Sequence, residues 1–135
     1  MRVLLDTNIL LDVLLDRAPF VTDSSAIWAA CDDGQIVGVI PASTLTDIFY
    51  IARRATDRAT ARVAVGLCLA AFDICPVDRI TIEQATALPG YDFEDNVQLA
   101  CAMIAGLDAV VTRNERDFSD SPIPNLAPAA LLARL

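Results

Sequence analysis

Short apolar runs alternate along this chain with longer segments whose apolar residues recur at helical spacing, and no other feature constrains the fold as strongly. Parallel strands need long crossover connections, which are usually helices, so this alternation predicts an α/β fold with a short central parallel sheet. The segments of strand length are residues 3–5, 36–40, 73–77 and 109–112. The segments of helix length are residues 8–15, 23–34, 43–54, 58–72, 81–88, 93–107 and 128–135. No internal repeat or linker interrupts the pattern, so we expect residues 1–135 to form a single domain.

The charged residues restrict the chemistry that the chain can perform. It contains no histidine and no lysine, all ten basic residues are arginines, and fifteen of the eighteen acidic residues are aspartates. A histidine base and a lysine nucleophile are therefore both excluded. The net charge of −8 argues against binding nucleic acid through a general basic coat. If nucleic acid is the substrate, a metal ion and local arginines must offset the repulsion.

Apolar residues make up 55% of the chain and the mean hydropathy is +0.48, yet no apolar run approaches the ~20 residues that span a bilayer. Asp6 interrupts the first apolar stretch, and no signal-peptide pattern is present. We therefore expect a cytoplasmic protein without membrane association. The four cysteines form no Cys-x-x-Cys pair and lie among apolar residues, so we expect buried free thiols rather than a zinc or redox site.

The first predicted strand ends on a carboxylate, Asp6, which Thr7 and Asn8 follow before the helical pattern begins. An ionised aspartate is costly to bury at such a position unless it is paired or binds a metal. Asp6 could instead cap the next helix, because aspartate and asparagine are good N-cap residues. Both interpretations stay open at this point, and Thr7 and Asn8 either orient the carboxylate or cap the helix themselves.

Further acidic residues lie in two predicted helices. Asp47 stands beside the apolar face of the helix at 43–54, either as a site residue or as an acid that the helix dipole favours near the first turn. Asp92, Glu94 and Asp95 lie together at the start of the helix at 93–107. Capping and the dipole explain some of these acids, but like charges repel unless they share a cation. In the functional interpretation, the side chain of Asp95 points into a site, and Glu94 or Asp92 lies on the rim of that site.

Polar residues also follow the predicted strand at 109–112. Thr112, Asn114 and Asp117 either form a polar turn or contribute to a site. In open parallel sheets, sites lie at the carboxyl ends of the strands, so these residues and Asp6 are expected at one edge. Convergent carboxylates without a lysine or histidine partner form an oxygen-rich site that suits Mg²⁺ or Mn²⁺. Such a metal activates water and stabilises charge on phosphoryl oxygens, as phosphodiester hydrolysis requires.

The residues described above resemble the PIN-domain family, in particular the toxin ribonucleases of VapBC-type toxin–antitoxin modules. The matching stretches follow one another at the spacing of the family: "LLDTNILLDVLL", "ASTLTDIFYI", "DFEDNVQLACAMIAGLDAVVTRNERDF" and "IPNLAPAALL". The resemblance implies a PIN-like three-layer α/β/α sandwich with a short central parallel sheet. It also implies a divalent-metal-dependent endoribonuclease that uses Mg²⁺ or Mn²⁺ to hydrolyse RNA.

The site residues follow when the resemblance is carried over residue by residue. Asp6 is similar to the first metal-binding acid of the family and Asp95 to the third. Asp47 takes the place of the second acid, which is more often glutamate in the family. The fourth place falls on Asn114 or on Asp117, and Asp117 is predicted to be catalytic together with the other three aspartates. The residues predicted to support the site are Thr7, Asn8, Glu94, Thr112 and Asn114.

Arginines are the only side chains of this protein that can offer positive charge to RNA. Arginine makes bidentate hydrogen bonds to phosphate, and Arg113 and Arg116 are predicted to bind the substrate. Arg53 and Arg54 are further arginines available for such contacts.

The resemblance also implies an antitoxin protein as a partner. Because the helices rich in alanine, leucine and isoleucine leave apolar surface to spare, we further expect a homodimer through the helices at 43–54 and 58–72. Two other functions stay open. One is a binding or regulatory module that keeps the PIN fold without cleavage, which Asp47 in place of glutamate and the high acidity favour. The other is a phospho-aspartate receiver, and the absence of lysine argues against it.

Overall fold

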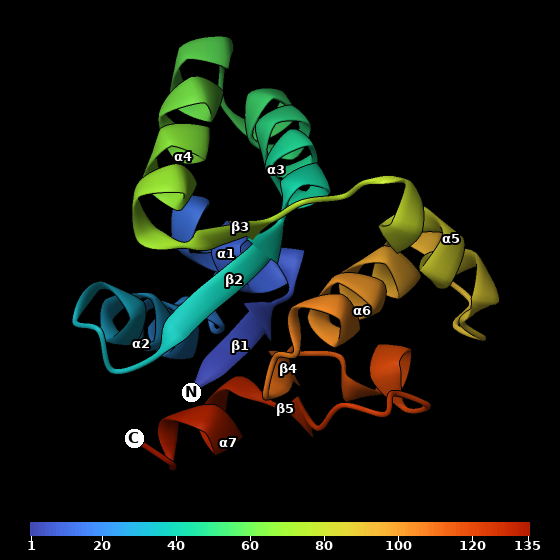
Figure 1. Ribbon diagram of the computed structural model, residues 1–135. Coiled ribbons are helices and arrows are strands. Elements are labelled where there is room, and N and C mark those ends of the chain that lie inside the picture. The colour runs from blue at the N-terminus through green and yellow to red at the C-terminus, as the bar shows by residue number, and fades with distance from the viewer.

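The computed structural model describes residues 1–135 and contains one five-stranded sheet in which all neighbouring strands are parallel (Figure 1). The strands lie in the order β3-β2-β1-β4-β5. The four predicted strands are present, and the predicted α/β class with a parallel sheet is confirmed. A periodic pattern cannot predict β5, because two residues are too few to show one. The strand bounds are β1 Arg2–Leu5, β2 Val37–Pro41, β3 Asp73–Cys75, β4 Ala109–Val111 and β5 Asn125–Leu126.

Seven α-helices accompany these strands, and each predicted helical segment overlaps one of them. Asp57 caps α4 by accepting a hydrogen bond from a backbone N–H, and Gly106 ends α6 in the left-handed conformation (φ +64°) that glycine adopts at low cost. None of the helices combines the length and the hydropathy that a membrane-spanning helix requires. The helix bounds are α1 Thr7–Leu14, α2 Val21–Asp32, α3 Ala42–Ala55, α4 Arg58–Ala71, α5 Arg79–Ala87, α6 Phe93–Ala105 and α7 Pro128–Leu132. A short 3₁₀ turn, η1 (Glu115–Phe118), follows β4.

Successive residues of the strands pack into cores on opposite faces of the sheet. Val3 and Leu5 of β1 belong to a core of 19 buried residues that includes side chains of α1, α2, α3, α4 and α7. Leu4 points the other way and packs with α6 in a second core of 9 buried residues, and α5 packs on α6. Each fully buried leucine stabilises the fold by roughly 1.5–3 kcal/mol. Helices therefore cover both faces, which makes a three-layer α/β/α sandwich (Figure 1).

The cysteines are free, as the sequence predicts. Three of them are buried, and Cys31 is partly buried. Burial raises the pKa of the Cys68 thiol to about 12, so this side chain stays protonated and packs as a small apolar group.

The order of the strands opens a crevice at one end of the sheet. From β1 the chain builds outward through β2 and β3, and it then returns to place β4 on the other side of β1. At such a reversal the crossover helices leave for opposite faces, and the carboxyl ends of the strands between them become accessible. Leu5 and Val111 are register partners at the ends of β1 and β4, so Asp6 and Thr112 follow side by side.

Candidate active site

Asp6 lies at the end of β1 with only 7% of its surface exposed. Its carboxylate accepts a hydrogen bond of 2.8 Å from the hydroxyl of Thr112. Although Asp6 immediately precedes α1, its side chain makes no capping hydrogen bond, so helix capping does not explain this carboxylate. Burial raises the pKa of Asp6, while hydrogen bonds from Thr112 and Gln98 act in the opposite direction.

The segment after β4 holds a second carboxylate in place. Thr112 is fully buried, and its hydroxyl oxygen accepts a hydrogen bond of 3.0 Å from the backbone N–H of Asn114. The side-chain amide of Asn114 in turn donates a hydrogen bond of 2.8 Å to the carboxylate of Asp117. Asp117 lines the clefts described below. The structure therefore places Asp117 on the walls of these clefts, where the hydrogen bond from Asn114 holds its carboxylate.

The start of α6 supplies three acids to the same region. Asp92 caps the helix, because its carboxylate accepts hydrogen bonds from the backbone N–H groups of Glu94 (2.8 Å) and Asp95 (3.3 Å). The capping interpretation is thus confirmed for Asp92, and it places the other two acids in the first turn. Burial raises the pKa of Asp95 to about 7, together with the charges of Asp92, Asp6 and Asp117. Asp95 therefore faces carboxylates from three other positions of the chain.

Asp47 and Glu94 meet across the space between α3 and α6. Asp47 lies beyond the first turn of α3, where the helix dipole no longer favours an acid. Burial, a hydrogen bond to Asp47 and the charge of Asp47 raise the pKa of Glu94 to about 7. Two carboxyl groups can share a hydrogen bond only if one of them holds a proton. Glu94, which we expect on the rim, is therefore in direct contact with the acid on α3.

Gln98 is a site residue that the sequence motifs do not reveal. Its side chain is 1% exposed, and Nε2 donates a hydrogen bond of 3.1 Å to the hydroxyl oxygen of Thr7. That hydroxyl donates in turn to the carboxylate of Glu94 at 3.3 Å, so the predicted supporting role of Thr7 has a contact that explains it. Gln98 also contacts Asp6 and thereby joins α6 to β1. A lone polar residue within the apolar run "VQLACAMIA" is the signal that marks this position.

Arg113, which we predict to bind substrate, is engaged elsewhere in the structure. Its Nε and Nη2 atoms donate hydrogen bonds of 2.8 and 3.2 Å to the two carboxylate oxygens of Asp12. Asp12 is completely buried on α1 and also accepts a hydrogen bond from Ser24. The guanidinium lies 3.8 Å from the centre of the Phe20 ring. A bidentate, stacked guanidinium is not free for phosphate, so we do not assign substrate binding to Arg113.

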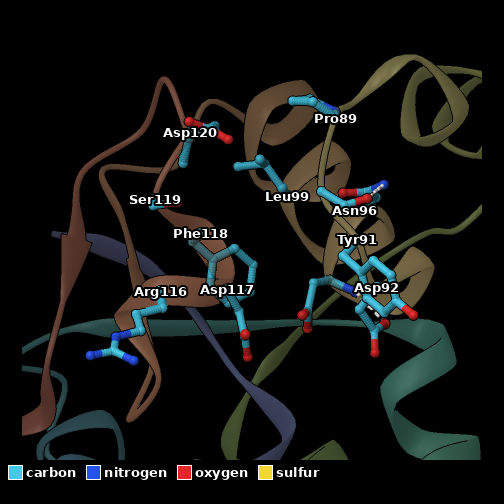
Figure 2. A pocket seen from close by; sticks show the side chains of 13 residues that line it. Pro89, Tyr91, Asp92, Asn96, Leu99, Arg116, Asp117, Phe118, Ser119 and Asp120 are labelled. Atoms are coloured by element: carbon cyan, nitrogen blue, oxygen red, sulfur yellow. Dashed lines mark hydrogen bonds between the residues drawn. The ribbon is translucent and has the colours of Figure 1, made fainter.

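The carboxylates line a cleft of about 370 Å³ at the carboxyl edge of the sheet. Asn8 lines the same cleft and accepts a hydrogen bond of 3.4 Å from Arg17. Arg54 of α3 is the only basic residue on its walls. A second cleft of about 350 Å³ adjoins it, between the loop before α6 and η1 (Figure 2). The acids that line the first cleft are Asp6, Asp47, Asp92, Glu94, Asp95 and Asp117.

The donor set of this cleft fits a divalent cation. No three of the side chains lie close enough together to form a preassembled metal site. Carboxylate oxygens are nevertheless the ligands that Mg²⁺ and Mn²⁺ prefer, and burial together with neighbouring carboxylates raises the pKa values of Glu94 and Asp95 to about 7. Binding of a divalent cation here would therefore release protons from the cluster.

Comparison with known proteins identifies the family. A family model described as PIN domain matches residues 2–116. No curated protein matches the sequence.

Solved structures of toxin–antitoxin proteins share the fold. The Mycobacterium tuberculosis toxin VapC20, described as cleaving the sarcin–ricin loop, has a TM-score of 0.72 at 16% identity, with 90% of this chain and 95% of that chain covered. VapBC2 from Rickettsia felis, bound to a fragment of promoter DNA, has a TM-score of 0.68 at 13% identity, with coverages of 94% and 98%. A toxin–antitoxin complex from Klebsiella pneumoniae has a TM-score of 0.68 at 23% identity, with coverages of 93% and 97%. The predicted PIN-like sandwich is thereby confirmed.

Proposed function

This chain belongs to the PIN domain family, and on that premise we propose that it is a divalent-metal-dependent endoribonuclease, the toxin of a toxin–antitoxin pair. The observation that carries the proposal is the convergence of carboxylates from β1, α3, α6 and η1 on one cleft. In a protein without histidine, such a cation-binding cluster can supply the activated water and the charge stabilisation that phosphodiester hydrolysis requires. The structural neighbour described as cleaving the sarcin–ricin loop supports RNA as the class of substrate.

Four aspartates would hold the metal ion. Asp6 and Asp95 are the principal ligands in this proposal, and Asp47 and Asp117 complete the set from α3 and η1. Mg²⁺ or Mn²⁺, when bound, lowers the pKa of water and stabilises the charge that develops on phosphoryl oxygens. The hydrogen bond from Thr112 keeps the Asp6 carboxylate oriented toward the cleft.

The neighbouring polar residues prepare the cluster to accept a cation. Burial and the neighbouring Asp47 raise the pKa of Glu94 to about 7, so Glu94 is partly protonated at neutral pH and binding of a cation would displace that proton. Thr7, at the start of α1, donates a hydrogen bond to Glu94 and accepts one from Gln98 of α6, which limits the positions that the Glu94 carboxylate can adopt. Asn114 does the same for Asp117. These contacts reduce the reorganisation that metal binding requires.

RNA cleavage by the purified protein tests the proposal. Structured and single-stranded RNAs are incubated with Mg²⁺ or Mn²⁺, with and without EDTA, beside Asp95→Asn. We expect metal-dependent cleavage by the wild type and a loss of at least 10²-fold in the variant, on the order expected for removal of a metal ligand. Asp32→Asn is the matched control, because Asp32 is an exposed acid at the end of α2, on the opposite edge of the sheet. If the wild type neither cleaves RNA nor binds Mn²⁺, the protein is a binding module and not a nuclease.

We also propose two protein partners, an antitoxin and a second copy of the chain. The structural neighbour from Klebsiella pneumoniae is described as a toxin–antitoxin complex, which supports the first. Three large apolar side chains on α4 are at least half exposed, which supports a contact through this predicted helix: Val63, Leu67 and Leu69. Light scattering should return twice the chain mass of 14.5 kDa. A single chain mass at high concentration would exclude the homodimer.

A further inference from the structure

We infer that a single strand of RNA crosses the carboxylate cluster through the two joined clefts, and that Arg54 and Arg116 bind its phosphates on either side of the scissile bond. This inference rests on the proposed ribonuclease function and adds the path of the substrate. In this inference, the strand enters beside α3 and leaves beside η1.

The two clefts form one continuous groove. The first is bounded by α1 and α3, and the second lies between the loop before α6 and η1. Asp92, Asp95 and Asp117 line both, so the carboxylates stand where the clefts meet. Figure 2 shows Arg116 and Asp117 on one wall of the second cleft and Tyr91 and Asp92 on the other. A strand that enters beside α3 and leaves beside η1 therefore passes the proposed metal ligands at its midpoint.

The positions of the basic residues on the cleft walls identify the two arginines. Six acids line the first cleft, and a phosphate held there is repelled unless a cation lies near it. Arg54 is the only basic residue on the walls of the first cleft, and Arg116 is the only one on the walls of the second. Neither forms an ion pair, because the two salt bridges of the protein involve Arg79 and Arg113. Both guanidinium groups are therefore free to bind phosphate beside the cluster.

An exposed tyrosine accompanies each arginine and favours an unpaired strand. Tyr50 lines the first cleft and is 53% exposed, while Tyr91 lines the second and is fully exposed. Exposed aromatic rings along a groove stack the bases of single-stranded nucleic acid without regard to sequence. The loop that carries Tyr91 is held by Asn96, whose Nδ2 donates to the carbonyl oxygens of Leu88 (3.3 Å) and Gly90 (3.1 Å). These hydrogen bonds hold the backbone of the loop that carries the Tyr91 ring.

Arginine variants test the path, and the chain offers a matched control. Arg134 follows α7, is exposed, forms no ion pair and does not line either cleft. Arg54→Gln and Arg116→Gln are compared with Arg134→Gln by fluorescence anisotropy on a short labelled single-stranded RNA of mixed sequence. Ca²⁺ replaces Mg²⁺ in the buffer, because it takes the same oxygen ligands. Cleavage of the same RNA is then measured in Mn²⁺.

Each of the two variants should bind RNA about tenfold more weakly than the wild type, which is the size of one charge-assisted hydrogen bond. The slope of log K against log salt concentration should become shallower by about 0.7 for each arginine removed. In cleavage, KM should rise with little change in kcat, and the affinity for Mn²⁺ measured by calorimetry should stay unchanged. Arg134→Gln should match the wild type throughout.

The outcomes separate this inference from the proposed function. If the wild type cleaves RNA and all three variants bind and cleave alike, the path is wrong while the nuclease function stands. If the wild type binds RNA without cleaving it, and the binding depends on Arg54 and Arg116, the path stands and the nuclease function fails. Absence of RNA binding by the wild type overturns the inference, and so does an equal loss in Arg134→Gln.

Discussion

Replacing Asp95 by asparagine should make the folded protein more stable at pH 8 while it abolishes the proposed activity. Asparagine has nearly the same shape as aspartate but carries no charge, so it relieves the repulsion at the cleft. The pKa of Asp95 is raised from an ordinary value of 3.8 to about 7 by burial and by three neighbouring carboxylates. The folded state therefore binds this proton more tightly than the unfolded chain does, and ionisation of Asp95 destabilises the fold.

The magnitude follows from this difference in pKa. One pKa unit corresponds to about 1.4 kcal/mol, so the interval from 3.8 to about 7 amounts to about 4 kcal/mol for a fully buried group. Because Asp95 is only partly buried, solvent screening reduces the penalty to about 2 kcal/mol. The favourable interaction of the charge with the N-terminus of α6, which asparagine loses, is worth about 0.5 kcal/mol. The net gain of about 1.5 kcal/mol corresponds to a rise in Tm of roughly 6 °C for a domain of this size.

The pH dependence provides the stringent part of the test. A raised folded-state pKa means that the stability is fully present below the unfolded value near 4 and is lost as the pH rises through about 7. The gain from Asp95→Asn should therefore be largest at pH 8 and shrink steadily toward pH 4. Thermal melts followed by circular dichroism in EDTA measure it, with Asp32→Asn as the control. An unchanged or lower Tm at pH 8, or a gain that does not vary with pH, would refute the reasoning.

Three further predictions concern the metal, the buried ion pair and a tight loop. At pH 8, Mn²⁺ at about 100 times its dissociation constant should stabilise the wild type by about 2.7 kcal/mol and Asp95→Asn by much less. Calorimetric melts measure this difference. Arg113→Met leaves Asp12 fully buried without its partner and should cost about 3 kcal/mol in urea denaturation, whereas the double variant with Asp12→Leu should recover most of the loss. Equal stability of the single and double variants would contradict that account. Gly90→Ala should lower the Tm, because its Cβ would collide with the side chain of Asn96, whereas Gly66→Ala on α4 meets open space and should raise it.

Local patterns predict a large part of this fold because they depend on neighbouring residues alone. The strand at 3–5 and its helix are visible in the sequence, since burial on both faces of a parallel strand requires a continuous apolar run. The capping role of Asp92 is also local, because the N–H groups that it binds belong to the next turn. The two-residue β5 is invisible for the opposite reason, since only its pairing with β4 makes it a strand.

By itself, the sequence determined the α/β class and the position of Asp6 and Thr112 at the ends of two strands, because strand length and helical spacing are properties of short segments. Only the tertiary structure decided which polar side chains meet. Thr112 donates a hydrogen bond to Asp6, which lies 106 positions away in the chain. Arg113 binds Asp12, which lies 101 positions away, so Arg113 is not free for phosphate, whereas Arg54 is. No local rule distinguishes one arginine from another, because the partner that engages an arginine is supplied by a distant segment that the packing of the layers brings beside it.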